Sequence, residues 1–407
     1  MKIAVFSDTH LGFDEKGERY SESFENLGQA IKIALQGEAD FCVLCGDIFD
    51  APVPSHNVLY RAIESFSLAK SGSSAASFVL EKNSEKKALQ ISGLPLITIH
   101  GNHEFRGKET KTALDVLNLS GLIVYLHAGK IIAEKGNERV CVFGLGAVPE
   151  KRALDVLHHW NPVPEKGACN LLLLHQTFKE FIVIDDEMVA TLSLDDLPSG
   201  FDLIVNGHLH WANEQKLRET TFLLAGSTIA TSIKKLECEK PKGVFFFDSA
   251  SKELSFTPFP RQRKMFYHRV LLDSASQENV LGDCRSAIES DLREKQEMKP
   301  LIRINLKGTL KKGLSSADID LKEITEAYSG RAFLSVSKNF LADSFRKKIS
   351  ELRELQKSRL SIAAMGFDIL EKNLKETDFG GAFDLKEIFD LLAEDELEKA
   401  LEKVSHS

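Results

Sequence analysis

The stretch "LPLITIHGNHE" (Leu94–Glu104) decides how the rest of the chain is interpreted. Its apolar first half is typical of a short buried strand. A glycine, an amide and an imidazole follow at Gly101, Asn102 and His103. Such residues at the end of a buried strand form either an ordinary turn or part of a functional site. Similar side chains at the ends of other predicted strands would favour a site.

Strand-like and helix-like segments alternate along the first 260 residues. Helical spacing of apolar residues predicts helices over 20–36, 55–70 and 109–121, with Ser55 as the N-cap of the second. Short apolar runs predict strands over 2–8, 39–47, 94–104, 140–146, 170–177, 201–210, 221–227 and 243–249. Alternating strands and helices followed by further strands predict an α/β fold, a two-sheet sandwich flanked by helices.

The remainder of the chain is predicted to form three further parts. Two strand-like runs, 267–273 and 301–308, enclose a helical stretch, 276–296, and predict a small α/β domain. A basic helical stretch comes next. The chain then breaks at "DFGG" between two amphipathic segments, which predicts a C-terminal helix–loop–helix. The predicted parts are 1–260, 261–337, 338–360 and 361–407.

Net charge is distributed unevenly along the 407 residues. The whole chain carries −8, and Ala363 to Ser407 hold 12 acids and 5 lysines, which is −7, so the other 362 residues carry −1. Lys338 to Ser361 hold 7 basic and 3 acidic residues, and "FPRQRKMFYHR" (Phe259–Arg269) is also basic. A nearly neutral body with basic patches can bind phosphate backbones, whereas the acidic end suits a basic partner.

The sequence predicts a cytoplasmic protein. It has no apolar run long enough to cross a bilayer, and "MKIAVFSDTH" has Asp8 and His10 where a signal peptide would still be apolar. The six scattered cysteines are typical of a reducing compartment. Cys42 and Cys45 have the spacing of a redox pair, but three residues along a strand put two thiols on opposite faces. That favours two plain core cysteines.

Five short stretches each end a predicted strand with candidate metal ligands: "SDTH", "GD", "GNHE", "LLLLHQ" and "NGHLH". Strand ends that converge at one edge of a sheet are where α/β proteins place their sites. On an extended strand end, residues two apart point the same way, as expected for Asp8 with His10 and for His208 with His210. The candidate ligands are Asp8, His10, Asp47, Asn102, His175, His208 and His210.

This mixture of carboxylates, imidazoles and one amide suits Mn²⁺, Fe²⁺ or Zn²⁺ better than an all-oxygen magnesium site. It is large enough for two ions that share one carboxylate. Each motif alone is weak, since a lone "GD" is usually a turn and a lone histidine at a strand end is usually structural. The complete set, in this order and each after an apolar strand, favours a metal site.

The ordered set closely resembles the calcineurin-like metallophosphoesterases. The resemblance implies a first metal held by Asp8, His10, Asp47 and His210. It implies a second metal held by Asp47, Asn102, His175 and His208, with Asp47 as the bridge. Two such ions about 3.5–4 Å apart can clamp an in-line phosphoryl transfer. His103 would be free of both metals and act on the substrate as the catalytic acid or as a stabiliser of the transition state.

The wider sequence resembles the archaeal-type nuclease subunit of the DNA double-strand-break repair complex, which is related to the bacterial exonuclease subunit that cleaves hairpins. The stretches that carry this likeness are "DTHLG", "GDIFD", "LITIHGNHE", "LLLHQ", "DDLPSGFDLIVNGHLH" and "LLAGSTIATS". It covers mainly residues 1–260 and implies a nuclease with two Mn²⁺ ions per chain that cuts duplexes from the 3′ end and also cuts single strands and hairpins.

The same resemblance implies an architecture and partners. Residues 261–337 would be a DNA-binding capping domain, and 361–407 would dock on a coiled-coil ABC-type ATPase. The protein would be a homodimer, associated with the nucleoid and not with a membrane. Apolar stripes around Leu59, Ile63 and Phe66 and around Leu114 and Leu117 match the family's dimer helices, although they equally suit an internal core.

Two features depart from the archaeal members of the family. Some of these have a second histidine three residues after the bridging aspartate, where this chain has Asp50; His56 follows later without aligning. A Ser-rich break and a predicted β-hairpin that turns at Asn83 and Ser84 form an insert over 71–92. The roles of Asp50, His56 and the insert stay open.

Two other kinds of function compete with the nuclease. A phosphatase or cyclic-nucleotide phosphodiesterase could use the same fold and metals, but would not need the capping domain, the basic linker and the terminal helices. A non-catalytic DNA-end tether would need no complete ligand set. His100, His127, His158 and His159 follow no metal spacing and are expected to be structural.

Overall fold

The computed structural model describes residues 1–104, 110–182, 192–293 and 296–340, and beyond these only Lys386, Phe389 and Leu391, which are helical. The predicted basic linker after Phe340, and the rest of the helix–loop–helix over 361–407, lie outside the described residues. The chain divides into two compact units. One contains Met1–Tyr267 together with Asp291–Arg303 and Tyr328–Ser335, and the other contains His268–Ser290, Ile304–Ala327 and the residues from Val336 on.

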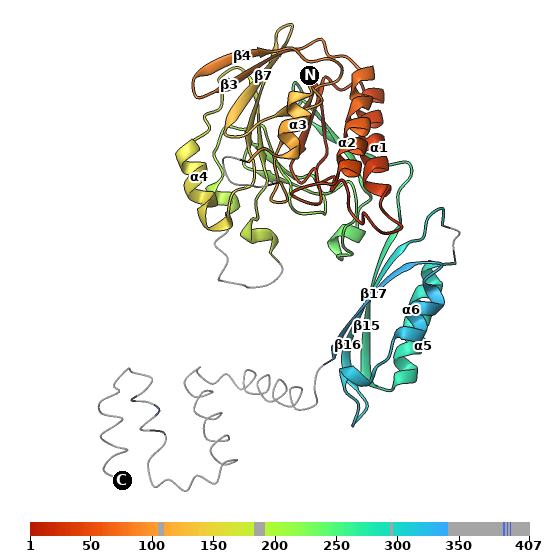
Figure 1. Ribbon diagram of the computed structural model, residues 1–407. Coiled ribbons are helices and arrows are strands. Elements are labelled where there is room, and N and C mark those ends of the chain that lie inside the picture. The colour runs from red at the N-terminus through yellow and green to blue at the C-terminus, as the bar shows by residue number, and fades with distance from the viewer. Residues whose placement is uncertain are drawn as a thin grey trace. The chain divides into compact units, whose positions relative to one another are not determined.

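The first unit is a sandwich of two mixed sheets (Figure 1). The first sheet has, in order, β14 (Leu254–Pro258), β13 (Gly243–Asp248), β1 (Lys2–Val5), β2 (Phe41–Cys45), β5 (Leu96–Ile99) and β6 (Val124–Tyr125). Strands β1, β2, β5 and β6 run parallel, and β13 runs antiparallel to β1. The carboxyl ends of four strands therefore meet at one edge.

The second sheet is larger and repeats this arrangement. Its order is β11 (Asn213–Leu217), β12 (Thr220–Leu224), β10 (Leu203–Asn206), β9 (Cys169–Leu174), β8 (Glu138–Leu145), β7 (Gly129–Lys135), β3 (Ser77–Lys82) and β4 (Glu85–Leu89). Strands β8, β9, β10 and β12 are parallel, so their carboxyl ends also share an edge. The predicted two-sheet α/β sandwich is confirmed.

Apolar side chains from both sheets form the central core. Strand residues from one sheet, such as Val43 and Phe41, and from the other, such as Leu171 and Val205, are fully buried in one cluster. Cys45 belongs to this cluster, whereas Cys42 lies in the separate cluster on the helix side. The expectation that the two thiols occupy opposite faces is confirmed, and both are free cysteines.

Helices cover the outer faces of the sandwich. On the first sheet lie α1 (Glu22–Gln36), α2 (His56–Ser67) and α3 (Ala113–Leu119), and α4 (Ala153–Trp160) packs on the second. Helices α1 and α2 run side by side (Figure 1). Ser55 caps α2 as predicted, because its hydroxyl accepts a hydrogen bond from the backbone N–H of Val58 at 3.2 Å.

The apolar stripes considered for dimer contacts are mostly core. Phe66, Leu114 and Leu117 are at most 1% exposed and pack between the helices and the first sheet. The packing decides between the two alternatives left open for these residues, because helical periodicity marks an apolar face without showing what covers it. Of the stripe residues only Ile63 is exposed, and the other exposed large apolar side chains of these two helices are Tyr60, Val116 and Leu119.

The predicted hairpin insert is confirmed. Strands β3 and β4 are joined by Asn83 and Ser84, whose φ angles of 52° and 66° are typical of a two-residue hairpin turn. The hairpin extends the second sheet beyond β7, with β4 at its edge. The insert is therefore an addition to the sheet rather than a separate domain.

The part of the chain from residue 261 on contains a three-stranded sheet, in the order β15 (Met265–Ala275), β16 (Leu301–Leu310) and β17 (Phe333–Phe340). Helices α5 (Gln277–Asp291) and α6 (Lys322–Tyr328) belong to the same region (Figure 1). The two strands and long helix predicted here are confirmed, whereas α6 and β17 were not foreseen. In the part of the chain that the structure describes, no helix has the length and apolar character needed to cross a membrane.

Candidate metal centre

The predicted ligands lie in five loops that leave the parallel strands of both sheets at the same edge. Strand β1 ends at Val5, β2 at Cys45, β5 at Ile99, β9 at Leu174 and β10 at Asn206. The loops are tied together through the backbone. The N–H of Asp8 donates to the carbonyl of Gly46 at 3.1 Å, and the N–H of His10 donates to the carbonyl of Asp47 at 3.0 Å.

Several ligand positions have an unusual backbone. The φ angles of Asp8, His10, Asp47 and His208 are 51°, 43°, 47° and 72°, in the left-handed region that non-glycine residues rarely adopt. The expectation that Asp8 and His10 sit on an extended strand end is therefore wrong. Both residues have left-handed backbone, which sets the directions of their side chains. Strain of this kind persists where surrounding contacts impose it, and it concentrates at functional sites.

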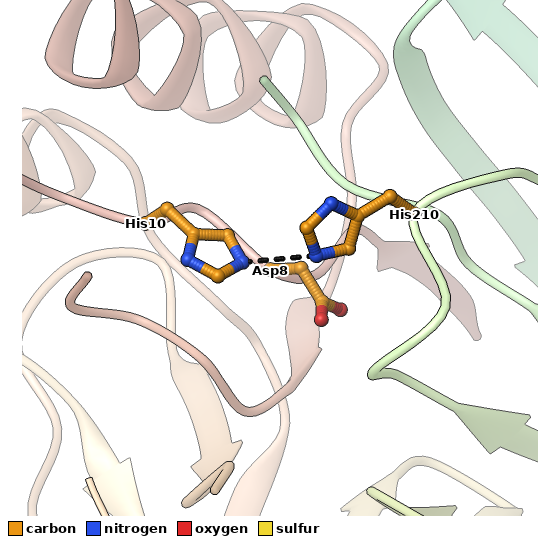
Figure 2. Close-up of side chains that lie close together, drawn as sticks. All are labelled: Asp8, His10 and His210. Carbon is orange, nitrogen blue, oxygen red and sulfur yellow. Dashed lines mark hydrogen bonds between the residues drawn. The ribbon is translucent and has the colours of Figure 1, made fainter. Parts of the chain in front are cut away.

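Asp8, His10 and His210 form the first ligand group (Figure 2). The Nε2 atoms of the two imidazoles are 3.1 Å apart. His210 is held from its other side, where Nδ1 lies 3.1 Å from the hydroxyl of Thr231. Asp8 accepts a hydrogen bond through Oδ1 from the backbone N–H of His208 at 2.8 Å, whereas its buried Oδ2 has no hydrogen-bond partner.

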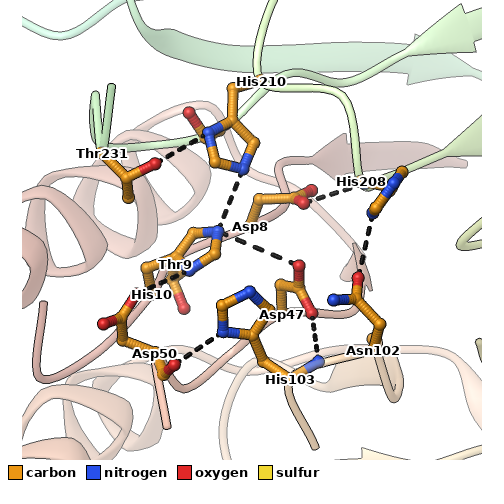
Figure 3. A network of polar contacts seen from close by, with 12 residues as sticks. Asp8, Thr9, His10, Asp47, Asp50, Asn102, His103, His208, His210 and Thr231 are labelled. Carbon is orange, nitrogen blue, oxygen red and sulfur yellow. Dashed lines mark hydrogen bonds and ion pairs between the residues drawn. The ribbon is translucent and has the colours of Figure 1, made fainter.

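Asp47, His175 and His208 form the second group, and Asn102 lies beside them (Figure 3). The side-chain oxygen of Asn102 is 3.0 Å from Nε2 of His175 and 2.9 Å from Nδ1 of His208. His208 and His210 thus serve different groups, which contradicts the expectation that they point the same way. Between them, the two groups and Asn102 contain all seven predicted ligands.

Asp47 connects the two groups. Its Oδ2 is 3.3 Å from Nε2 of His175 and 3.9 Å from Nε2 of His10, which belong to different groups. Its Oδ1 accepts a hydrogen bond from the backbone N–H of His103 at 3.0 Å. Burial alone would raise the pKa of Asp47, but His175 and then His10 outweigh it and hold the pKa below its usual value.

The side chains fit divalent cations. His175 donates through Nδ1 to the carbonyl of Cys45 at 2.6 Å, so the neutral ring presents a lone pair at Nε2. That lone pair faces two acceptors, the oxygens of Asp47 and Asn102. Burial would lower the pKa of His175, but Asp47 raises it to about 9. A positive charge is therefore favoured here. Burial also raises the pKa of Asp8, whose Oδ2 has no hydrogen-bond partner, to about 6.

His103 is half-buried and oriented differently from the ligands. Its Nδ1 donates to the backbone carbonyl of Asp50 at 2.6 Å, which leaves Nε2 as the nitrogen available to a substrate. Its ring meets the ring of His10 edge to face, with centroids 4.9 Å apart. His103 lies outside the group of Asp8, His10 and His210, but its ring also forms a further potential metal-binding group with His10 and Asp50 (Figure 3).

Comparison with known proteins agrees with this geometry. The family model for calcineurin-like phosphoesterases matches residues 1–212, just over half of the chain. The chain belongs to the calcineurin-like phosphoesterase family. The matched range contains every predicted metal ligand and His103. Divalent-metal binding goes with this metallophosphoesterase fold, and the two ligand groups are its candidate positions.

The curated relatives of this phosphoesterase include DNA repair proteins. It is 25% identical over 364 residues to the double-strand break repair protein MRE11 of Homo sapiens, covering 75% of this chain and 50% of that protein. The MRE11 protein of Arabidopsis thaliana is also 25% identical, covering 87% and 54%. The chain spans about half the length of the curated relatives it matches. A solved archaeal phosphodiesterase matches 63% of this chain and 99% of its own at 13% identity, with a TM-score of 0.31.

Other residues of this phosphoesterase hold the loops in place, and the sequence interpretation assigned them no role. Glu104 is buried and accepts hydrogen bonds from the backbone N–H groups of Phe49 and Gly101, both at 2.7 Å. It therefore clamps the Asp47 loop to the Asn102 loop. In the sequence, the only indication that Glu104 has a role was its position in "GNHE". Burial raises the pKa of Glu104 to about 7.

Two further buried side chains, Asn206 and Lys242, hold the loops that leave the second sheet in place. Asn206 accepts from the backbone N–H of Gln176 at 3.0 Å and donates to the carbonyl of the same residue at 3.0 Å, which joins the His175 and His208 loops. The ammonium of Lys242 donates to the carbonyl of His210 at 2.8 Å and to Glu237 at 2.7 Å. Lys242 lies outside every motif, so its hydrogen bond to the His210 loop could not be predicted from the sequence.

The histidines interpreted as structural lie outside both ligand groups. His100 is buried, lies 2.7 Å from the hydroxyl of Tyr125 through Nδ1 and packs against His127. Burial lowers the pKa of His100 to about 4, which keeps the ring neutral. His56, which begins α2, His158 and His159 are exposed.

Gly101→Ala is expected to destabilise the sandwich by about 1–3 kcal/mol, since an added Cβ would lie 2.0 Å from Oδ1 of Asp47. Urea denaturation followed by tryptophan fluorescence measures this effect, because Trp160 and Trp211 both lie in the first unit. Gly28→Ala is the control. Its Cβ would meet Leu68 at an ordinary 3.5 Å within α1, so about 0.5–1 kcal/mol of stabilisation is expected. Equal stability of the Gly101→Ala variant and the wild type would contradict the packing described.

Proposed function

We propose that this phosphoesterase is a Mn²⁺-dependent DNA nuclease that processes DNA ends in double-strand-break repair. It acts as a 3′–5′ exonuclease on duplexes and as an endonuclease on single strands. The observation that carries the proposal is the gathering of all seven ligands around Asp47, whose Oδ2 approaches both ligand groups. The similarity to MRE11 supports DNA as the substrate.

The geometry supports the proposed division of labour between the ligands. Asp8, His10, Asp47 and His210 hold one ion, and Asp47, Asn102, His175 and His208 hold the other. When bound, the pair of ions supplies Lewis-acid stabilisation of phosphoryl charge and makes water a stronger nucleophile at neutral pH. The Nδ1–H groups of His10 and His175 donate hydrogen bonds to Asp50 and to the carbonyl of Cys45, and this directs the Nε2 lone pairs of both rings toward Asp47.

His103 is proposed to act on the leaving oxygen. Its Nδ1–H is engaged by the carbonyl of Asp50, so the ring can present Nε2 to the phosphate without rotating away. A positioned imidazole can hold a proton at Nε2 and transfer it to the oxygen that departs from phosphorus. The hydrogen bond from the backbone N–H of His103 to Asp47 keeps this ring at a fixed place beside the metal-binding carboxylate.

The remaining parts are proposed to supply substrate and partners. Residues 261–337 would cap the site and bind DNA, and the linker 338–360 would add positive charge. The exposed Tyr60, Ile63, Val116 and Leu119 would contribute to a homodimer contact, which needs apolar surface. The proposed setting is the cytoplasm, at the nucleoid, with a coiled-coil ABC-type ATPase as partner.

A single assay distinguishes this function from its alternatives. The protein is incubated with Mn²⁺ and either end-labelled duplex DNA, a labelled single strand or p-nitrophenyl phosphate. A nuclease degrades the DNA substrates and is inhibited by EDTA. A phosphatase releases p-nitrophenol and leaves DNA intact. A tether retains labelled ends in a mobility shift without cutting them, and that result would overturn the proposal.

A chain that ends at Leu360 is expected to keep Mn²⁺-dependent cleavage of single strands and to lose association with the ATPase. The acidic segment after Ala363 carries −7, so it suits a basic surface and would be repelled by DNA. Co-purification of the shortened chain with the ATPase measures the loss, and the full-length chain is the control. Undiminished affinity of the shortened chain would show that 361–407 is not the docking element.

A further inference from the structure

Asp50 makes two hydrogen bonds that connect the metal centre to His103. Its carboxylate oxygen Oδ1 is 3.1 Å from Nδ1 of His10, and its backbone carbonyl accepts from Nδ1 of His103 at 2.6 Å (Figure 3). Asp50 also belongs, with His10 and His103, to one of the groups whose ligand atoms lie close enough together to hold a metal ion.

We propose that Asp50 is a positioning residue that fixes the ring orientation and tautomer of His10 through its side chain and of His103 through its main chain. The inference rests on the proposed function, because it concerns the same site. It assigns to one residue the alignment of a metal ligand and of the group that acts on the leaving oxygen.

The side-chain contact determines which nitrogen of His10 faces the ligands. A carboxylate only accepts hydrogen bonds, so Nδ1 of His10 carries the proton and Nε2 carries the lone pair. That Nε2 is the atom that lies 3.1 Å from His210 and 3.9 Å from Asp47. Carboxylates that hold metal-binding histidines in this way typically change metal affinity about 10–100-fold when they are removed.

The main-chain contact is set by a separate group of bonds. The N–H of Asp50 donates to the carbonyl of Leu11 at 3.0 Å, and the N–H of the preceding Phe49 donates to Glu104 at 2.7 Å. Phe49 itself is fully buried. These bonds do not involve the Asp50 side chain, which is 34% exposed. A substitution at Asp50 should therefore free His10 while the carbonyl stays in place beside His103.

Direct Mn²⁺ titration tests the side-chain contact with His10 separately from the main-chain contact with His103. Free Mn²⁺ is followed by electron paramagnetic resonance. Asp50→Ala is expected to weaken Mn²⁺ binding about 10–100-fold. Asp50→Asn should restore it, since the amide oxygen can still accept from His10. Asp50→Ser, whose hydroxyl is too short to reach His10, provides a second loss variant. Asp155→Ala, on the exposed side of α4, is the matched control and should bind like wild type.

Nitrogen chemical shifts of ¹⁵N-histidine-labelled, metal-free protein give a second readout that needs neither activity nor metal. In Asp50→Ala, the Nδ1 and Nε2 signals of His10 should shift toward a mixture of tautomers, while those of His103 stay unchanged. Unchanged His10 signals, or equal loss of Mn²⁺ affinity in the Asn and Ala variants, would overturn the inference. Absence of saturable Mn²⁺ binding in the wild type would instead overturn the proposed function. The nitrogen chemical shifts of the metal-free protein would still test the role of Asp50 in that case.

Discussion

Asp47→Ala is expected to abolish phosphodiester cleavage with Mn²⁺ and with every other divalent ion. Its carboxylate oxygen lies 3.3 Å from Nε2 of His175 and 3.9 Å from Nε2 of His10, so its loss removes an oxygen from both proposed metal positions. It also deletes the acceptor for the backbone N–H of His103. We expect the rate to fall by more than about 10³-fold, beyond the usual loss of one electrostatic stabiliser.

The measurement is single-turnover cleavage of labelled DNA in a series of Mn²⁺, Mg²⁺, Fe²⁺ and Zn²⁺. Asp155→Ala, an exposed aspartate on the same unit, is the control for loss of a carboxylate and should cleave at the wild-type rate. Recovery of appreciable turnover in Asp47→Ala with any of these ions would show that Asp47 does not bridge two metals.

His103→Leu is expected to retain both ions and to bind DNA ends, yet to lose about 10²–10⁴-fold in cleavage rate, the usual range for a positioned acid–base group. The reason is geometric. The ring uses Nδ1 for the carbonyl of Asp50, and His103 belongs neither to the group of Asp8, His10 and His210 nor to that of Asp47, His175 and His208. The backbone N–H of residue 103 still reaches Asp47 after the substitution, so the metal positions should survive.

Mn²⁺ titration and DNA mobility shifts test binding in His103→Leu, and single-turnover cleavage tests the rate. His103→Ser separates loss of the imidazole from the effect of the larger apolar side chain, and both variants should behave alike. His159→Leu, at an exposed position on α4, should match the wild type in every assay. Loss of one metal in either His103 variant would contradict a role confined to the substrate.

Most strands of the two large sheets, and the polar residues that follow them, were predictable because they depend on local patterns. Buried runs such as Leu171–Leu174 need only apolar residues in sequence, and the turn at Asn83 and Ser84 needs residues that accept a positive φ. The converging edge follows from parallel pairing, since the carboxyl ends of parallel strands share one side of a sheet. Those rules required no knowledge of distant contacts.

The orientation of the ligands was not predictable in the same way. Asp8 and His10 are turned by left-handed backbone that is imposed by bonds to Gly46 and Asp47, which are nearly 40 residues away in sequence. Helix faces raised a similar difficulty. Phe66 and Leu114 appear equally apolar whether they meet the sheet or a second chain, and only the packing distinguishes these cases.

Supporting residues were the hardest to find. Lys242 stabilises the loop that carries His210, and Asn206 joins the loops of His175 and His208, although neither follows a metal-ligand spacing. Their importance comes from burial together with hydrogen bonds to carbonyls and N–H groups far along the chain. Such partners depend on the complete tertiary arrangement, so no local pattern could have identified them.

The central claim is that one carboxylate holds two ions at the edge of the sandwich. The most direct test is a crystal structure of the protein soaked in Mn²⁺, with anomalous scattering recorded at the manganese edge. We predict two peaks about 3.5–4 Å apart, both in contact with Asp47, as in two-metal phosphoryl-transfer sites. A single peak, a peak held by His103, or two peaks that do not share Asp47 would contradict the account.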